Sequence, residues 1–572
     1  MSSLSVQNSR MRATASEDEP VAKKGKKVEQ EPVIELPSSV FVEITSKQQG
    51  ENTNTEGQTK ASLNTDGQST LTIPSSSTVE QLQELANSLL EVTKPHNINP
   101  LLHIVFTVFF ISPFDVFILR FFHMYVHVYL QNHEKLPYAF YINDYEIETT
   151  LADLLQFLIQ KKVLANTEEK IIIEYSPLSL FNVRPVTRQA ESMRGHTDAV
   201  TYVQFSPDGK GLVSGGGDMA IRFWNTSSLT PFHTCKGHRD HILAIAWSPD
   251  GSVLVAADKS GEIRVWDPLS GKQRGATMSG HRKYVTALCF EPYHVNINCV
   301  RLASASRDVT VRVWNIVTGI CETTISGHSD SIEALRWGGN GLIYTASRDR
   351  TIKVWAIDGH GKSQQKLVRT LNGHAHRINT LALNCDYILR TGPFQLGDNA
   401  NTLSSMSTAD KQKRALDRYT AMCGANNEIL VSGSDDFTMF MWTPQKGKTS
   451  MERMTGHQAL IFHIAFSPDG RYLASASLDK KVKLWNGTTG KFITVFHGHV
   501  GSVYQVSWSA DSNYFVSASK DSTIKLWSPK NKKKAEGTLP GHEDEVYALD
   551  WSPDGTQVAS GSKDRTVKVW HN

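Results

Sequence analysis

Histidine, aspartate and serine, the residue types of acid–base and nucleophilic chemistry, recur together through the second two thirds of this chain. The histidines stand in eight Gly-His pairs, at His196, His238, His281, His328, His374, His457, His499 and His542. Seven aspartates follow them, at Asp218, Asp308, Asp349, Asp436, Asp479, Asp521 and Asp564. Four residues before each aspartate stands a hydroxyl residue, at Ser214, Ser304, Thr345, Ser432, Ser475, Ser517 or Ser560. A Ser–His–Asp relay can activate a hydroxyl as a nucleophile, so the set must be tested as a catalytic candidate.

The repetition argues against catalysis, because one active site is not built eight times along a chain. The stretch SASK, Ser517 to Lys520, matches a serine-nucleophile pattern but falls on the same register as Ser304 and Thr345. No phosphate-binding glycine loop, nucleophile elbow or metal-ligand spacing occurs. The six cysteines form no C-x-x-C pair, which favours a reducing compartment and argues against zinc. We therefore predict a protein that is not an enzyme and has no cofactor and no metal of its own.

The spacing predicts the fold. A tryptophan closes each repeat, and most Gly-His pairs are 42 to 47 residues apart. In GHTDAVTYVQFSPDGKGLVSGGGDMAIRFWN, alternating strands are separated by turn-forming residues. The pattern resembles the WD40 repeat, in which each copy supplies four strands of a propeller blade. We expect a mainly β chain whose residues 181–572 form an eight-bladed β-propeller.

Antiparallel strands place each Gly-His turn and each aspartate turn at the same end of a blade. Histidine, aspartate, hydroxyl and tryptophan can then form one hydrogen-bonded chain that satisfies buried donors. The second blade departs, with Ala256 and Ser260 at the hydroxyl and aspartate positions, and we expect it to be the least rigid. The last repeat lacks a fourth strand, which we predict to come from Phe181 to Gln189 and to close the ring.

The fifth repeat carries an insertion, roughly Gly392 to Gly424, in which TADKQKRALDRYTAM has helical spacing. Such an insertion is either functional or a tolerated surface loop.

The first 180 residues differ from the repeats. Residues 1–38 are polar and are expected to be disordered, with KKGKK as either a nuclear-import patch or part of a plain solvated tail. In residues 39–180, SVFVEIT and STLTIP predict a hairpin, STVEQLQELANSLL a capped helix, and YAFYIND and EKIIIEY further strands. This order resembles a small α+β ubiquitin-like, or β-grasp, domain.

The combination resembles one family, Notchless, through the phrases LPYAFYINDYEI, RWGGNGLIYTASRDRTIKVW, YILRTGPF, VSGSDDFTMFMW and MTGHQALI. The resemblance implies a nucleolar and nuclear assembly factor of the large (60S) ribosomal subunit. Its propeller would bind the precursor particle, with its RNA and ribosomal proteins. The ubiquitin-like NLE domain would be gripped by midasin, an AAA ATPase that releases the factor. The alternative is a WD40 adaptor in Notch signalling or ubiquitin-ligase substrate recruitment.

The family resemblance also assigns a partner-binding residue. In that family an acid just before the last strand of the ubiquitin-like domain completes a metal site held by midasin. Alignment of EKIIIEY places this role on Glu168, with the adjacent Glu169 as the alternative. A carboxylate oxygen suits a hard cation such as Mg²⁺. From the residues alone, both acids read as ordinary solvated loop residues.

An apolar segment interrupts the ubiquitin-like domain at residues 92–131. Leu101 to Leu130 carries one acid and one permanent base and is long enough to cross a bilayer. A spanning helix would put the two halves of one small core on opposite sides of the membrane, so we expect no membrane. We interpret the segment as translated non-coding sequence or a poorly ordered insertion, and a membrane segment ranks second.

Five blades carry a cation just before the aspartate-turn position, at Lys259, Arg307, Arg348, Lys520 and Lys563. The net charge of +3 identifies no partner, but these residues would gather at the Gly-His end of the ring. We predict that they face RNA phosphate or an acidic partner, against the alternative of ordinary solvated turn residues.

Overall fold

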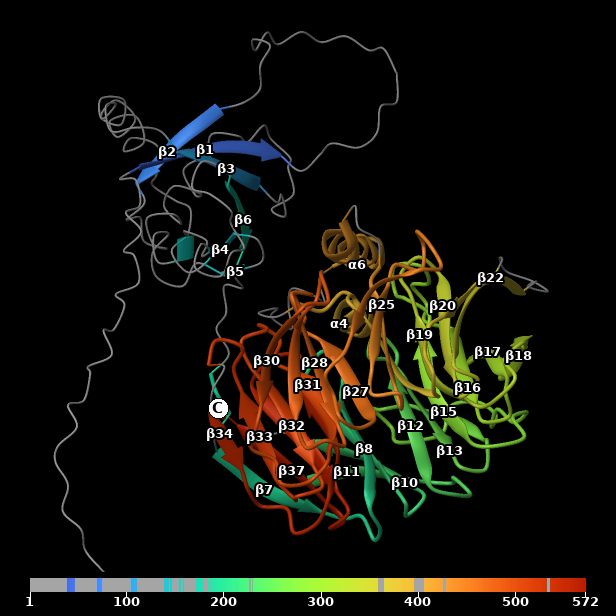
Figure 1. The fold of residues 1–572 in the computed structure, drawn as a ribbon. Helices are drawn as coiled ribbons and strands as arrows, with labels where there is room; N and C mark the ends of the chain where they lie inside the picture. Colours follow the sequence, from blue (N-terminus) through green and yellow to red (C-terminus); the bar gives the residue numbers. More distant parts are fainter. Residues whose placement is uncertain are drawn as a thin grey trace, which may run out of the picture. The chain divides into compact units, whose positions relative to one another are not determined.

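The computed structural model divides the chain into two compact units, Met1–Pro177 and Leu178–Asn572. Figure 1 labels strands and helices of both units. The described residues are 39–46, 69–74, 104–110, 138–142, 145–146, 154–155, 158, 171–177, 184–186, 188–225, 228, 230–357, 365–395, 406–424, 428–531 and 535–571.

The first unit contains a six-stranded sheet with the order β2-β1-β3-β6-β4-β5. Its strands are β1 (Ser39–Ser46), β2 (Ser69–Pro74), β3 (Ile104–Phe110), β4 (Tyr138–Ile142), β5 (Tyr145–Glu146) and β6 (Ile171–Pro177). The β1–β2 hairpin lies where the sequence predicts one. The ubiquitin-like assignment of the whole unit stays a prediction.

Seven residues of the apolar insertion form a strand. β3 pairs antiparallel with β1 on one side and with β6 on the other. β1 and β6 therefore run parallel to each other, separated by β3. No helix among the described residues is long and apolar enough to cross a membrane. The interpretation of residues 92–131 as translated non-coding sequence stays a prediction.

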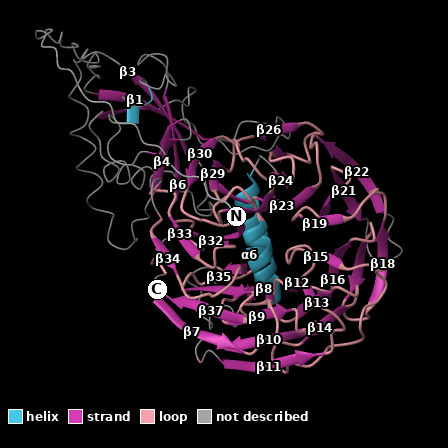
Figure 2. Ribbon diagram, turned by 60° about the horizontal axis from the view of Figure 1, so that its bottom comes forward, coloured by secondary structure: helices cyan, strands magenta, loops and turns pink. Residues whose placement is uncertain are grey.

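The second unit is a ring of eight small sheets, which confirms the mainly β, eight-bladed propeller (Figure 2). Seven blades have four strands and the second has three. Blades one to four contain β8 (Val200–Phe205), β9 (Gly211–Gly216), β10 (Ala220–Asn225), β11 (Thr230–Lys236), β12 (Ile242–Trp247), β13 (Leu254–Asp258), β14 (Ile263–Trp266), β15 (Val285–Phe290), β16 (Arg301–Ser306), β17 (Val311–Asn315), β18 (Ile320–Ile325), β19 (Ile332–Trp337), β20 (Leu342–Ser347), β21 (Thr351–Ile357) and β22 (Gln365–Asn372).

The fifth blade also receives two helices, α4 (Asp386–Thr391) and α6 (Thr408–Cys423). Blades five to eight contain β23 (Ile378–Leu383), β24 (Leu430–Ser434), β25 (Met439–Trp442), β26 (Ser450–Met454), β27 (Ile461–Phe466), β28 (Tyr472–Ser477), β29 (Val482–Asn486), β30 (Phe492–Phe496), β31 (Val503–Trp508), β32 (Phe515–Ser519), β33 (Ile524–Trp527), β34 (Gly537–Leu539), β35 (Val546–Trp551), β36 (Gln557–Ser562) and β37 (Thr566–His571).

The ring closes with a strand that precedes the first blade in sequence. β7 (Arg188–Arg194) pairs antiparallel with β37 and completes the eighth blade. Closure by a segment before the first Gly-His pair was predicted, but the predicted range, Phe181 to Gln189, begins too early. β7 runs directly into Gly195-His196, just as β11 runs into Gly237-His238 in the first blade.

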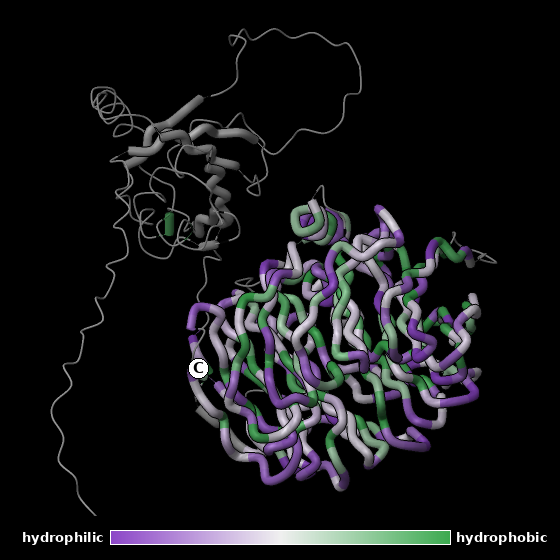
Figure 3. Tube along the Cα trace, viewed as in Figure 1, coloured by the Kyte–Doolittle hydropathy of each residue, from purple (hydrophilic) through white to green (hydrophobic). Residues whose placement is uncertain are grey.

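Apolar residues fill the spaces between neighbouring blades. One cluster joins Tyr344 and Ile352 of the fourth blade to Leu381 and Trp442 of the fifth. Figure 3 shows the hydrophobic stretches along the strands and the hydrophilic ones mainly at the turns. The tryptophan that ends the third strand of each blade is at most 3% exposed. This packing holds the two ends of the ring, where the turns lie, in fixed positions.

Candidate functional site

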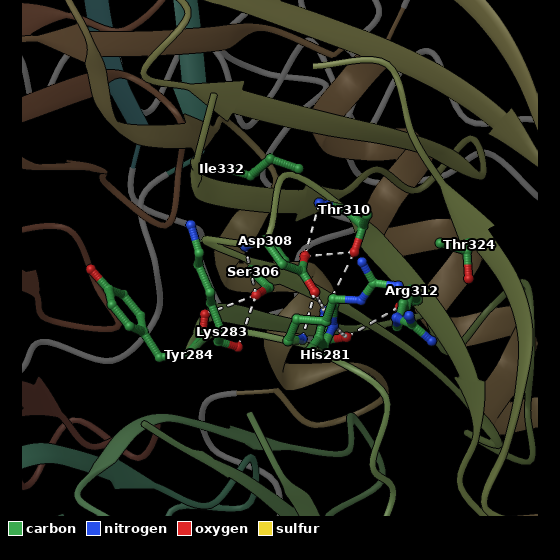
Figure 4. Close-up of polar contacts among 12 residues, drawn as sticks. His281, Lys283, Tyr284, Ser306, Asp308, Thr310, Arg312, Thr324 and Ile332 are labelled. Carbon is green, nitrogen blue, oxygen red and sulfur yellow. Dashed lines mark hydrogen bonds and ion pairs between the residues drawn. The ribbon is translucent and has the colours of Figure 1, made fainter. Parts of the chain in front are cut away.

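The predicted hydrogen-bonded chain is present in the third blade, and Figure 4 labels its His281 and Asp308. The Trp314 Nε1–H donates to Ser304 Oγ at 2.8 Å, and Ser304 Oγ lies 2.7 Å from His281 Nε2. His281 Nδ1 lies 2.9 Å from Asp308. One proton arrangement satisfies every atom: Ser304 donates to Nε2, and the Nδ1–H donates to the carboxylate.

The histidine–aspartate and histidine–hydroxyl contacts recur in all the other blades that keep these residue types. The tryptophan–hydroxyl bond recurs in all of them except the eighth, where Trp570 Nε1 is buried without a hydrogen-bond partner. The histidine–aspartate distances are 2.7–3.0 Å in seven blades. The histidine–hydroxyl distances are 2.6–2.8 Å. All seven hydroxyl residues are 0% exposed. A substrate cannot reach these oxygens, so the relays have the connectivity of a hydrolase triad but serve to fix the turns.

Burial and hydrogen bonding together shift the pKa values of the histidines and aspartates in these relays. Removal from water lowers the pKa of His196, His457 and His542 below the usual value, despite the neighbouring aspartates. Burial alone would raise the pKa of the aspartates. Hydrogen bonds from histidine and backbone N–H groups outweigh it. They lower the pKa of Asp479, and they hold the pKa well below the ordinary range in the six others, Asp218, Asp308, Asp349, Asp436, Asp521 and Asp564.

The second blade replaces the missing aspartate from an unexpected position. Asp258, two residues before Ser260, lies 3.0 Å from His238 Nδ1 and accepts a hydrogen bond from the Ser260 hydroxyl. The missing hydroxyl is not replaced. With Ala256 in its place, His238 Nε2 and Trp266 Nε1 are buried without a hydrogen-bond partner. The second blade therefore keeps the histidine–aspartate contact that fixes the turn, and it lacks the hydroxyl that would join histidine to tryptophan.

The five predicted basic residues lie at the Gly-His end, but four of them have local partners. Arg348 pairs with Glu333 at 2.5 Å, Lys520 with Glu545 at 3.6 Å and Lys563 with Asp544 at 3.4 Å. Arg307 donates to the Tyr284 hydroxyl at 2.7 Å and lies over its ring. The side chain of Lys259 has no ion pair or hydrogen bond among the described residues.

The repeat pattern does not predict these neutralising acids, because they come from the first strand of a blade or from turns and share no spacing. Glu168 and Glu169 lie outside the described residues, so their roles stay a prediction. Within the ranges given above, no group of three or more His, Cys, Asp or Glu side chains could hold a metal ion.

The insertion of the fifth blade lies at the end of the ring opposite the Gly-His turns. It connects β23 to β24, so it begins before the predicted Gly392, and it includes α4. Arg390 of α4 binds Asp550 of β35 at 2.8 Å and the Phe205 carbonyl of β8 at 3.2 Å. Asp386 of α4 accepts from Arg336 of β19 at 3.1 Å. One short helix thereby connects blades one, four and eight.

Helix α6 lies across the middle of the ring (Figure 2). It occupies the stretch for which spacing predicts a helix. Its Tyr419 ring stacks on His294 of the third blade, with centroids 4.8 Å apart, and Gln412 donates to the His294 carbonyl. Gly392 follows α4 directly and has a φ of 53°. A Cβ at this position would come 2.8 Å from the Pro249 carbonyl. The described residues of the insertion, which we call the plug, thus pack against the blades.

A buried carboxylate anchors this plug. Glu428, 0% exposed, accepts hydrogen bonds from the Tyr344 hydroxyl at 2.6 Å, the Gly339 N–H at 2.6 Å and the Tyr419 hydroxyl of α6 at 2.9 Å. Burial raises the pKa of this carboxyl, whereas the three donors favour its ionised form. No repeat position predicts it, because it belongs to the insertion.

The chain matches a known repeat family and a solved structure. The "WD domain, G-beta repeat" family matches residues 187–225, 229–267, 272–315, 319–356, 448–486, 490–528 and 533–571, all blades except the interrupted fifth. A computationally designed protein, "Ika8", superposes with a TM-score of 0.52 at 26% identity. The match covers 68% of this chain and all of that one.

Three relatives are similar over much of their length. "Protein Notchless" of Drosophila melanogaster is 50% identical over 342 residues, which are 59% of this chain and 68% of that protein. "Notchless protein homolog" of Arabidopsis thaliana is 47% identical over 65% of this chain and 76% of its own. "Ribosome assembly protein 4" of Saccharomyces cerevisiae is 44% identical over 60% and 67%. The chain belongs to the Notchless family.

Proposed function

We propose that this protein is a non-catalytic assembly factor of the large ribosomal subunit, working in the nucleolus and nucleus. The observation that carries the proposal is its 44% identity to a protein named for ribosome assembly. The burial of the hydroxyl residue in all seven relays supports the non-catalytic part. A rigid ring with two differently built ends suits a scaffold that holds other macromolecules.

Sedimentation of cell extracts tests the proposal. The tagged chain is expected to comigrate with large-subunit precursor particles and to return to the top of the gradient after RNase treatment. Migration only as free protein, or together with a ubiquitin ligase or a Notch pathway component, would favour the adaptor function.

Within this function, the Gly-His end is proposed to contact RNA phosphate or an acidic protein. Lys259 and Arg307 are the two predicted cations without a carboxylate partner among the described residues, so substituting them tests the proposal most directly. Glu at both positions should weaken particle binding and reduce its salt dependence. Glu at Arg348 is a poorer choice, because it would face Glu333.

We further propose that midasin releases the factor by gripping the ubiquitin-like unit, with the Glu168 carboxylate completing a metal site on midasin. Glu168→Ala should abolish binding of the full chain to midasin, and chelator should have the same effect on the wild type. The variant should still load onto particles and accumulate there. Loss only in Glu169→Ala would transfer the role to that residue, and indifference to chelator would discard it.

A further inference from the structure

A surface pocket lies beside the plug, at the end of the ring opposite the Gly-His turns. It has a volume of about 500 Å³, within the range of ligand sites. Tyr419, Thr420 and Cys423 of α6 form one wall. Asn340 and Leu342 of the fourth blade and Gln445 of the fifth form the other.

Among the described residues, the lining of this pocket contains no charged side chain, but a buried carboxyl group lies directly behind it. Tyr419, one of its walls, donates its hydroxyl to the buried Glu428. Among the described residues Glu428 accepts from the two tyrosine hydroxyls, the Gly339 N–H and, at 3.9 Å, the Cys385 thiol, and no cation pairs with it. The neighbouring residues 425–427 are Ala-Asn-Asn and supply none. A buried carboxylate without a counter-charge is costly and attracts a cation that approaches it.

The end of α6 adds to this negative potential. The helix ends at Cys423, which lines the pocket, and its last turn contains no basic residue. The C-terminal end of a helix carries partial negative charge and usually has lysine or arginine nearby. The nearest cation in sequence to the far wall, Lys446, is exposed and follows Gln445.

We propose that this pocket binds a lysine or arginine side chain from an extended basic segment of a partner protein. The apolar wall, Leu342 and the edge of Tyr419, would pack against the methylenes, while the charged head would face the end of α6 and Glu428. This inference goes beyond the proposed function. It concerns the other end of the ring from Lys259 and Arg307, so either proposal can fail without the other.

Calorimetry with the full chain tests the pocket. The probe is a twelve-residue peptide of alternating lysine and serine, compared with the same peptide carrying acetylated lysines. The wild type should bind only the charged peptide. Gln445→Lys places an ammonium in the pocket and should weaken binding by roughly tenfold, the size of a charged hydrogen bond. It should also raise the melting temperature.

Leu269→Lys is the matched control. Leu269 occupies the same position in the second blade, three residues after its tryptophan, and is 89% exposed. This variant should bind like the wild type. Glu428→Gln should also weaken binding. Equal binding of both peptides, wild-type affinity in Gln445→Lys, or an equal loss in Leu269→Lys would overturn the proposal.

Discussion

At the scale of single residues, the relay of the second blade is an incomplete copy that can be repaired. Ala256→Ser should give His238 Nε2 and Trp266 Nε1 the hydroxyl that seven other blades possess. The gain should be about 0.5–1.5 kcal/mol in the free energy of unfolding, measured by urea denaturation. Ala257→Ser is the control, because adjacent residues of a strand face opposite sides and the new hydroxyl would be buried without a partner. Equal effects of the two variants would contradict the relay as a source of stability.

The relays also make stability depend on pH. Histidines whose folded-state pKa is lowered contribute stability that is complete above their unfolded pKa of roughly 6.5 and is lost as pH falls below it. The stability contributed by His196, His457 and His542 therefore decreases as the pH falls. The aspartates add a second loss only below pH of about 3.8. Thermal unfolding between pH 7.5 and 5 should show a falling midpoint, and a flat or rising midpoint would exclude this origin.

The sequence predicts these relays well because each depends on a fixed spacing within one repeat. Prediction from the sequence fails where a side chain pairs with a residue outside the fixed positions of the repeat. Asp258 lies outside the aspartate register, and Glu333 and Glu545 lie on or beside inner strands. Arg348 meets Glu333 because their strands are paired, and Lys520 meets Glu545 of the next blade, so the two pairs share no spacing in the sequence.

At the scale of elements, the plug is held by ion pairs between segments far apart in sequence. Arg390→Gln should leave Asp550, 8% exposed, without its partner and destabilise the propeller by about 1–3 kcal/mol. The double variant Arg390→Gln, Asp550→Asn should be less destabilised than the single one, because no buried charge is left unpaired.

A surface pair provides the comparison. Arg239, 74% exposed, pairs with Glu262, and Arg239→Gln should cost less than about 1 kcal/mol. Urea denaturation measures all three variants. Equal losses for Arg390→Gln and Arg239→Gln would mean that α4 is not a structural anchor. Helical spacing in the insertion predicts α6, but contacts such as Arg390–Asp550, 160 residues apart, are invisible to spacing.

At the scale of the whole molecule, the apolar insertion can be tested by removing it. Without β3 the sheet order becomes β2-β1-β6-β4-β5, and the parallel strands β1 and β6 become neighbours, as in a β-grasp sheet. Deletion of residues 92–131 should therefore leave a soluble chain whose first unit resists proteolysis. The deletion also removes apolar surface that promotes aggregation. An unfolded first unit after deletion would show instead that β3 belongs to the working fold.

Closure of the ring by β7 and β37 means that the eighth blade can form only late in the synthesis of the chain. The two strands that meet in the eighth blade, β7 and β37, are joined by pairs such as Arg194 with Thr566, about 370 residues apart. At a translation rate of 5–20 residues per second, β7 would wait roughly 20–75 s for its partner. Throughout that time the nascent chain exposes open sheet edges at both ends of an incomplete ring. Pauses and chaperones acting on the nascent chain should therefore influence the yield of this protein more than they influence proteins whose blades close locally.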